Sequence, residues 1–198
     1  GAHPGYPDLM GFGRRALSVT PAEMKSYIMY QVGALQTFLR ADGMTLQHVK
    51  PHGAMYNAAA KDIKLSRAIC EAIAECAPGA ILLCLSGSEM CRAAEECGIL
   101  YASEVFADRA YEDDGSLVAR SKPGAVITDE NEAIARVVRM VRESKVTSVN
   151  GKDISIKADS ICVHGDNAHA LEFVTRIRAA LKAENISTAP LGDVISAR

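Results

Sequence analysis

The stretch that decides the fold reads His48-Val49-Lys50-Pro51-His52-Gly53-Ala54-Met55-Tyr56-Asn57. Residues 46–50 are typical of a short strand, and Pro51 ends it because proline has no N–H for a ladder hydrogen bond. Gly53 permits a sharp turn, after which the chain can become helical. Ligands of α/β proteins bind at the C-terminal ends of strands, so we predict a functional turn here. The alternative is a structural turn rich in His and Lys.

Composition narrows the class of protein. The chain has 198 residues, of which 48% are hydrophobic and 23% charged, and this predicts one soluble globular domain over residues 1–198. A net charge of −2 argues against general binding to nucleic acid or to a membrane surface. No apolar run approaches the roughly 20 residues of a membrane span. The six cysteines contain no CxxC pair, so we expect free thiols, a cytoplasmic location and no thiolate zinc site.

Strand and helix patterns alternate along the chain. The first helix is predicted to begin after Thr20 and to run to about Ala41, and further helices follow Asp62, Ser88 and Asp129. Apolar strand patterns lie at 80–85, 99–102 and 160–163. This alternation predicts an α/β fold with a mostly parallel sheet and helices outside it. Asn150-Gly151 predicts a β-hairpin excursion over residues 146–157.

Polar clusters follow four of the predicted strands. They span residues 3–14, 48–56, 104–109 and 164–166. In a (β/α) barrel such positions converge on one mouth, so we expect the four clusters to meet. Each cluster also has a simpler interpretation: a disordered terminus, a structural turn, a surface ion-pair group, and a helix cap for Asp166.

The side chains in these clusters suit hydrolysis. Imidazoles can act as general bases or as metal ligands, and carboxylates can do either as well. Lysine and arginine can hold an anionic group or stabilise developing negative charge. The sequence has no GxxxxGK[ST] loop, no GxSxG elbow and no GxGxxG fingerprint, so it shows no nucleotide site of its own and no serine nucleophile.

Five strings of sequence carry a resemblance to a known family. They are GAHPGYPD at 1–8, GFGRR at 11–15, QHVKPHGAMYN at 47–57, EVFADR at 104–109 and VHGD at 163–166. In their order and wording they resemble the LamB/YcsF family, and the match extends from residue 1 to about residue 186. The strings VKPHGAMYN at 49–57 and SEVFADR at 103–109 make the resemblance specific.

The resemblance implies a (β/α) barrel of the polysaccharide-deacetylase (NodB-like) type, in which residues 1–3 are native strand sequence. Members of the family begin with about two further β/α units, which carry NxDxGE-like and GxHAGD-like motifs that this sequence lacks. We therefore expect a barrel that is incomplete at its N-terminus. Unpaired strand edges would favour association, which leaves room for a homo-oligomer.

The resemblance also implies an activity, the ATP-dependent opening of the 5-oxo-L-proline lactam to L-glutamate. The chain would be the A subunit of a 5-oxoprolinase, with the B and C subunits as partners and ATP acting at the level of the complex. A His or carboxylate base would direct water at the activated carbonyl, while Lys50 or Arg109 neutralises the oxyanion. The expected catalytic residues are His48, Lys50, His52, Glu104, Asp108 and His164. The expected substrate-binding residues are His3, Asp8, Arg14, Tyr56, Arg109 and Asp166.

Two other functions remain open from the same residues. One is a stand-alone metal-dependent amidase or deacetylase, with His48, His52 and His164 as candidate ligands of a divalent metal such as zinc or manganese. The other is a non-catalytic scaffold or regulatory subunit. Bound metal would favour the first, and retention of partner subunits without hydrolysis would favour the second.

Overall fold

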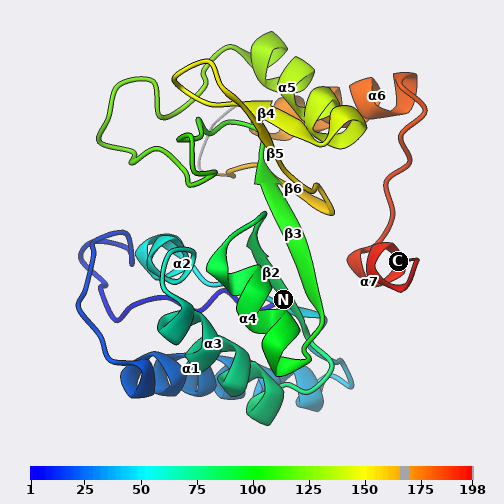
Figure 1. Ribbon diagram of the computed structural model, residues 1–198. Coiled ribbons are helices and arrows are strands. Elements are labelled where there is room, and N and C mark those ends of the chain that lie inside the picture. The colour runs from blue at the N-terminus through cyan, green and yellow to red at the C-terminus, as the bar shows by residue number, and fades with distance from the viewer. Residues whose placement is uncertain (166–169, 198) are drawn as a thin grey trace. The chain divides into compact units, whose positions relative to one another are not determined.

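The structure is a computed structural model that describes residues 1–165 and 170–197 (Figure 1). Its contacts divide the chain into two compact units, Gly1–Ala102 and Ser103–Arg198. We describe each unit by itself. Within the described residues, no helix combines the length and the apolar character that a bilayer span requires.

The first unit alternates helices and strands. Its elements are α1 (Pro21–Ala41), β1 (His48–Val49), α2 (Gly53–Ala59), α3 (Ile63–Cys76), β2 (Ile81–Leu85), α4 (Glu89–Cys97) and the start of β3 (Tyr101–Phe106). Strands β1 and β2 pair in parallel, with His48 opposite Ile81. Ala2 forms a parallel bridge with Val49, so residues 1–3 run beside β1 as the family resemblance implies.

Local capping signals place the helices of this unit. The Thr20 hydroxyl accepts a hydrogen bond from the Glu23 N–H, and the Glu23 carboxylate accepts one from the Thr20 N–H, which confirms the predicted capping box at the start of α1. The Asp62 carboxylate caps α3 by accepting from the N–H groups of Lys64 and Leu65. Gly98 ends α4 in the left-handed conformation, with φ of 66°.

The core of the first unit lies between its helices and strands. Helix α1 packs against α3, and α3 packs against α4 (Figure 1). Met24, Ile28 and Val32 of α1 are fully buried, as their spacing predicts. Phe38 lies ten residues after Ile28 on the same helix, and it is 70% exposed. Ideal helix geometry places Phe38 about 80° around the axis from Ile28, at the edge of the buried face.

The second unit contains the rest of β3, α5 (Glu130–Glu143), β4 (Lys145–Thr147), β5 (Asp153–Ser155), β6 (Ser160–Cys162), α6 (Ala170–Ala183) and α7 (Leu191–Ser196). Strands β3 and β6 pair in parallel, with Phe106 opposite Cys162. Strands β4 and β5 form an antiparallel hairpin where the Asn150-Gly151 turn predicts one. The hydrogen-bonded order of the parallel sheet is β1-β2-β3-β6.

Two strand boundaries differ from the prediction. Strand β1 is limited to two residues, whereas the sequence suggested residues 46–50. Strand β3 begins and ends later than the predicted 99–102, because residues 104–106 continue the ladder with β6. Glu104 therefore lies inside a strand and is 2% exposed, rather than following the strand end.

Helices α5 and α6 enclose the core of the second unit. They pack against each other (Figure 1). Their buried face is an apolar cluster made up of Ala107, Ala133, Val137, Phe173, Ile177 and Leu181. This packing covers the C-terminal end of β3, where Asp108 follows the strand.

Candidate active site

His3 and His52 form a hydrogen-bonded chain in the first unit. His3 Nδ1 lies 2.6 Å from the Lys50 carbonyl oxygen, and His3 Nε2 lies 2.9 Å from His52 Nδ1. His52 Nε2 in turn lies 2.7 Å from the Phe12 carbonyl oxygen. We call this chain of contacts the histidine relay. All four ring nitrogens of the two residues are engaged within it.

The turn after β1 positions the histidine relay. The His52 N–H donates to the Pro4 carbonyl at 2.8 Å, and the Ala54 N–H donates to the Gly13 carbonyl at 2.9 Å. Gly53 adopts a φ of +56°, and a Cβ there would lie 2.6 Å from the Gly13 carbonyl oxygen. Glycine is therefore required at position 53 by both its conformation and the close approach of the loop.

Asp8 has a structural role in the N-terminal loop. Its side chain is 2% exposed and pairs with Arg15, whose Nε donates to Oδ1 at 2.9 Å. The Gly11 N–H donates to the same oxygen at 2.9 Å. These bonds, the one from Arg15 first, hold the pKa of Asp8 below its usual range. The Asp8 carboxylate, which the sequence predicts to bind substrate, thus stabilises the loop formed by residues 8–15.

The other predicted residues of the first unit lie at or near β1. His48 Nδ1 lies 3.1 Å from Gln47 Oε1, and burial, helped by neighbouring positive charges, lowers the pKa of His48. Lys50 directly follows the strand and is half-buried, while Tyr56 on α2 is 3% exposed. The Arg14 guanidinium carbon lies 5.3 Å from the centre of the Phe12 ring.

Asp108 and His164 form a dyad in the second unit. His164 Nδ1 lies 2.8 Å and 3.0 Å from the two carboxylate oxygens of Asp108. They follow β3 and β6, which are parallel neighbours, so the sheet brings their C-terminal ends together. The Phe106 ring stacks on the imidazole, with the ring centres 5.9 Å apart.

The geometry of the dyad assigns the tautomer of His164. A carboxylate only accepts hydrogen bonds, so the nitrogen that faces it carries the proton. The neutral ring then has its lone pair on Nε2, which can accept a proton from a reacting group. The side chains of His164 and Asp108 are 23% and 19% exposed, so the pair is neither sealed in the core nor fully hydrated.

Arg109 anchors a loop in the second unit. Its side chain is 4% exposed, and it donates to the carbonyl oxygens of Ala125 at 3.2 Å and Val118 at 2.5 Å. Burial lowers the pKa of Arg109. Two of the Arg109 donors therefore bind main-chain carbonyls. Substrate binding by Arg109 stays a prediction.

Arg136 of α5 is a partly buried cation that sequence reasoning missed. Its Nη2 donates to the Arg109 carbonyl at 3.2 Å, and burial lowers its pKa. Within the part of the chain that the structure describes, its Nη1 is buried without a hydrogen-bond partner. An arginine on an amphipathic helix carries no signal in the sequence that would distinguish it from a surface residue.

Glu104 and Asp166 are the remaining predicted site residues. The Glu104 side chain is buried within β3. Asp166 lies outside the described residues. The convergence of the four clusters on one mouth stays a prediction, because the two units are described separately.

The predicted metal ligands do not form a metal site in the described residues. In residues 1–165 and 170–197, no three His, Cys, Asp or Glu side chains gather closely enough to hold a metal ion. Both ring nitrogens of His52 are engaged in the histidine relay, and His164 Nδ1 faces Asp108. His48 and His52 belong to the first unit and His164 to the second, so a metal site that joins them stays a prediction.

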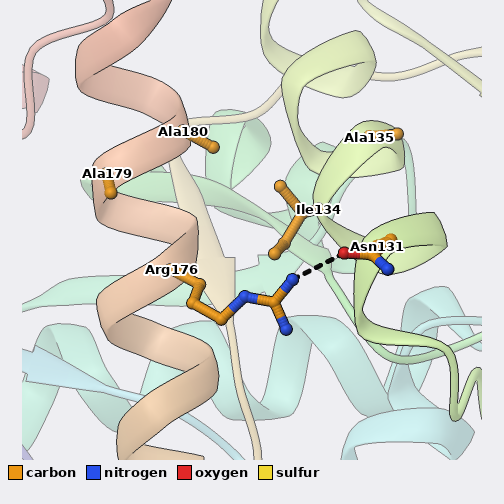
Figure 2. A pocket seen from close by; sticks show the side chains of 6 residues that line it. All are labelled: Asn131, Ile134, Ala135, Arg176, Ala179 and Ala180. Carbon is orange, nitrogen blue, oxygen red and sulfur yellow. Dashed lines mark hydrogen bonds between the residues drawn. The ribbon is translucent and has the colours of Figure 1, made fainter.

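An open hollow of about 430 Å³ lies between α5 and α6 (Figure 2). It is lined by Asn131, Ile134, Ala135, Arg176, Ala179 and Ala180. The Arg176 guanidinium spans it and donates to Asn131 Oδ1 at 2.6 Å. None of the predicted site residues lines this hollow, so the dyad and the histidine relay remain the candidate machinery.

Comparisons with known proteins agree with the family resemblance that the sequence carries. A model of the LamB/YcsF family matches residues 1–196. The chain is 63% identical over 191 residues to the 5-oxoprolinase A subunit of Clostridium beijerinckii, covering 96% of this chain and 75% of that protein. It is 57% identical over 195 residues to the 5-oxoprolinase A subunit of Campylobacter jejuni, covering 98% of this chain and 76% of that protein.

A solved structure also matches the fold. The crystal structure of a lactam utilization protein from Thermus thermophilus superposes with a TM-score of 0.85 at 42% sequence identity, covering 95% of this chain and 75% of that protein. This likeness and the parallel sheet confirm the predicted α/β fold class, a (β/α) barrel of the NodB-like type. The match over nearly the whole chain shows that the protein belongs to the LamB/YcsF family.

Proposed function

We propose that this chain is the A subunit of a multisubunit, ATP-dependent 5-oxoprolinase, which opens the lactam of 5-oxo-L-proline to L-glutamate. The names of its relatives support this proposal, because they share 57–63% of its residues over almost its whole length. The single observation that carries the chemistry is the Asp108–His164 dyad. Its geometry is that of an oriented general base.

The reaction breaks the lactam C–N bond and joins a water oxygen to the carbonyl carbon. The water loses a proton, and the ring nitrogen gains one as it leaves as an amine. A lactam is a poor electrophile, so ATP is consumed to activate the carbonyl. The sequence has no phosphate-binding GxxxxGK[ST] loop, so in this proposal the B and C subunits supply much of that step.

The dyad supplies the proton transfer in this scheme. His164 Nε2 takes the proton from the attacking water, and Asp108 holds the Nδ1 proton and stabilises the imidazolium that forms. As the tetrahedral intermediate collapses and the C–N bond breaks, the same nitrogen returns the proton to the leaving amine. Lys50 remains our candidate for neutralising the oxyanion, and His48 and Glu104 remain candidates for acid–base chemistry.

The experiment measures glutamate released from 5-oxoproline and ATP by the chain reconstituted with B and C subunits. Removing the base or its orienting carboxylate, in His164→Gln or Asp108→Asn, should lower turnover by about 10²-fold or more. Asp153→Asn is the matched control, because Asp153 pairs with Arg139 on the surface of the same unit. It should keep nearly full turnover.

Three outcomes separate the functions. Near-normal turnover in both dyad variants would remove the dyad from the mechanism. Hydrolysis by the chain alone, without ATP or partners, would favour a stand-alone amidase, and metal analysis of the purified chain would then follow. A chain that retains the partner subunits without any hydrolysis would favour a scaffold or regulatory role.

A further inference from the structure

The main chain around Asp108 is tied to two other segments of the second unit. The Ile127 N–H, in the loop after β3, donates to the Asp108 carbonyl at 2.9 Å. The next carbonyl along the chain, that of Arg109, accepts a hydrogen bond from Nη2 of Arg136 on α5 at 3.2 Å. The loop thus contributes a main-chain bond, whereas the helix contributes a side chain.

We propose that Arg136 is a positioning residue for the lactam hydrolysis: from α5 it holds the Arg109 peptide and so keeps the preceding Asp108 carboxylate against His164. This inference rests on the proposed function, because it assigns Arg136 to the dyad of that reaction. Arg136 acts through Asp108 and does not touch the substrate in this account.

The surroundings of Arg136 are those of a side chain with a specific role. Burial lowers its pKa, and the nearby Tyr111, Glu132 and Asp108 oppose that change. Taking a cation partly out of water costs free energy, which hydrogen bonds and negative charges can offset. An apolar side chain would fill the same space without that cost. The guanidinium is therefore best explained by the bond that it makes to the Arg109 carbonyl.

Arg109 is held on its other side by its own loop. Its side chain donates to the carbonyl oxygens of Ala125 and Val118, and the Ala110 N–H donates to the Ala125 carbonyl at 3.1 Å. The loop and α5 therefore fix residue 109 from two directions, with Arg136 as the contact from the helix. Loss of either contact would loosen the peptide that follows the dyad carboxylate.

The dyad depends on the position of this peptide. The two Asp108 oxygens lie 3.0 Å and 2.8 Å from His164 Nδ1. Aspartate has one methylene group between its main chain and its carboxyl group, so the main chain largely sets where these oxygens lie. A displacement of about 1 Å in a catalytic arrangement can lower the rate by about 10²-fold.

The kinetic test uses the complex reconstituted with B and C subunits. Arg136→Met removes the donors but keeps an unbranched side chain, and kcat for glutamate release should fall by about tenfold or more. KM for 5-oxoproline should stay within about twofold. Arg136→Lys keeps the charge and one donor for the Arg109 carbonyl, so it should recover part of kcat. Arg142→Met on the same helix is the matched control, because Arg142 pairs with Glu184 at the surface, and turnover should stay nearly full.

A double variant separates positioning from a loss of folded protein. In the Asp108→Asn background, Arg136→Met should change turnover by less than about twofold, because the group that Arg136 positions is already lost. A smaller folded fraction would lower turnover by the same factor in both backgrounds, and that result would overturn the proposal. Unaltered kcat in Arg136→Met would overturn it too. A raised KM with kcat retained would also overturn it, since it would indicate direct contact with the substrate.

Amide hydrogen exchange of the 198-residue chain alone keeps this inference separate from the proposed function. In Arg136→Met, the N–H groups of Ala110 and Ile127, which bond within this region, should exchange about tenfold faster than in the unaltered chain. The Ser148 N–H, bonded to the Lys152 carbonyl in the hairpin, should keep its rate. Faster exchange beside an unaltered complex that releases no glutamate would remove the proposed function and leave the support by Arg136 standing. Unchanged exchange at Ala110 and Ile127 would overturn the inference, with or without turnover.

Discussion

Buried polar side chains in this protein hold loops in place. Asp8 gathers the N-terminal loop through Arg15 and Gly11, and Arg109 binds two carbonyls of the loop after β3. The Tyr111 hydroxyl accepts a hydrogen bond from the Phe106 N–H at 2.9 Å. Each group satisfies main-chain donors or acceptors that would otherwise be buried without partners.

Asp8 makes stability depend on pH. Its pKa in the folded protein is held below the usual value near 4, mainly by Arg15, so its contribution is present above that value and is lost as pH falls through the lowered pKa. The difference in unfolding free energy between the unaltered chain and Asp8→Asn should therefore shrink as pH falls below about 4. Urea unfolding across pH 3–7 measures it. A gap that stays constant, or that is unaffected by Arg15→Gln, would contradict this role.

Tyr111 should be worth more to stability than an exposed tyrosine. Tyr111→Phe leaves the buried Phe106 N–H without its acceptor, which costs about 1–3 kcal/mol of unfolding free energy. Tyr30→Phe is the control, because Tyr30 is 80% exposed, and it should change stability by less than about 0.5 kcal/mol. Urea unfolding of the three proteins decides it, and equal effects from both substitutions would refute the prediction.

At the scale of the element, capping residues decide where helices begin. Thr20, Asp62 and Asp129 each accept hydrogen bonds from the first-turn N–H groups of α1, α3 and α5. The same three residues stand out in the sequence, because threonine and aspartate at these positions satisfy donors that have no partner inside the helix. The strands are less clearly marked, since their ends depend on which neighbour they pair with.

The capping box of α1 can be tested by substitution. Thr20→Ala removes the acceptor for the Glu23 N–H and should lower the unfolding free energy by about 1 kcal/mol. Thr37→Ala is the control inside the same helix, where the hydroxyl donates only to the Gly33 carbonyl on an exposed face. It should be neutral or slightly stabilising, because alanine is the better helix former. Thermal and urea unfolding compare the two, and equal losses would argue against the cap.

At the scale of the whole molecule, charge and partners matter most. The net charge of −2 argues against general binding to nucleic acid, and the partners in our proposal are protein subunits. We expect the 21.1 kDa chain to associate with the B and C subunits, and light scattering after size exclusion measures the mass of the mixture. Elution of the chain unchanged beside them would contradict the complex. The same trace of the chain alone tests the homo-oligomer.

The candidate site was foreseeable in its residues and less so in their roles. The strings at 1–8, 47–57, 104–109 and 163–166 contain the residues that form the histidine relay and the dyad. The sequence predicts that Asp8 and Arg109 bind a ligand. In the structure their side chains form hydrogen bonds within their own loops. A motif shows which polar groups are present. Whether such a group hydrogen-bonds to a main-chain carbonyl depends on how a distant loop folds.

The sequence by itself determined the α/β class, the alternation of helices and strands and the hairpin at 146–157, because caps, periodicity and turn residues act over a few neighbouring positions. Only the tertiary structure decided which polar groups meet. The contact between His3 and His52 joins residues 49 positions apart, and that between Asp108 and His164 joins residues 56 apart. Such contacts arise because parallel pairing brings the C-terminal ends of two strands together. Local sequence patterns do not show which strands will pair.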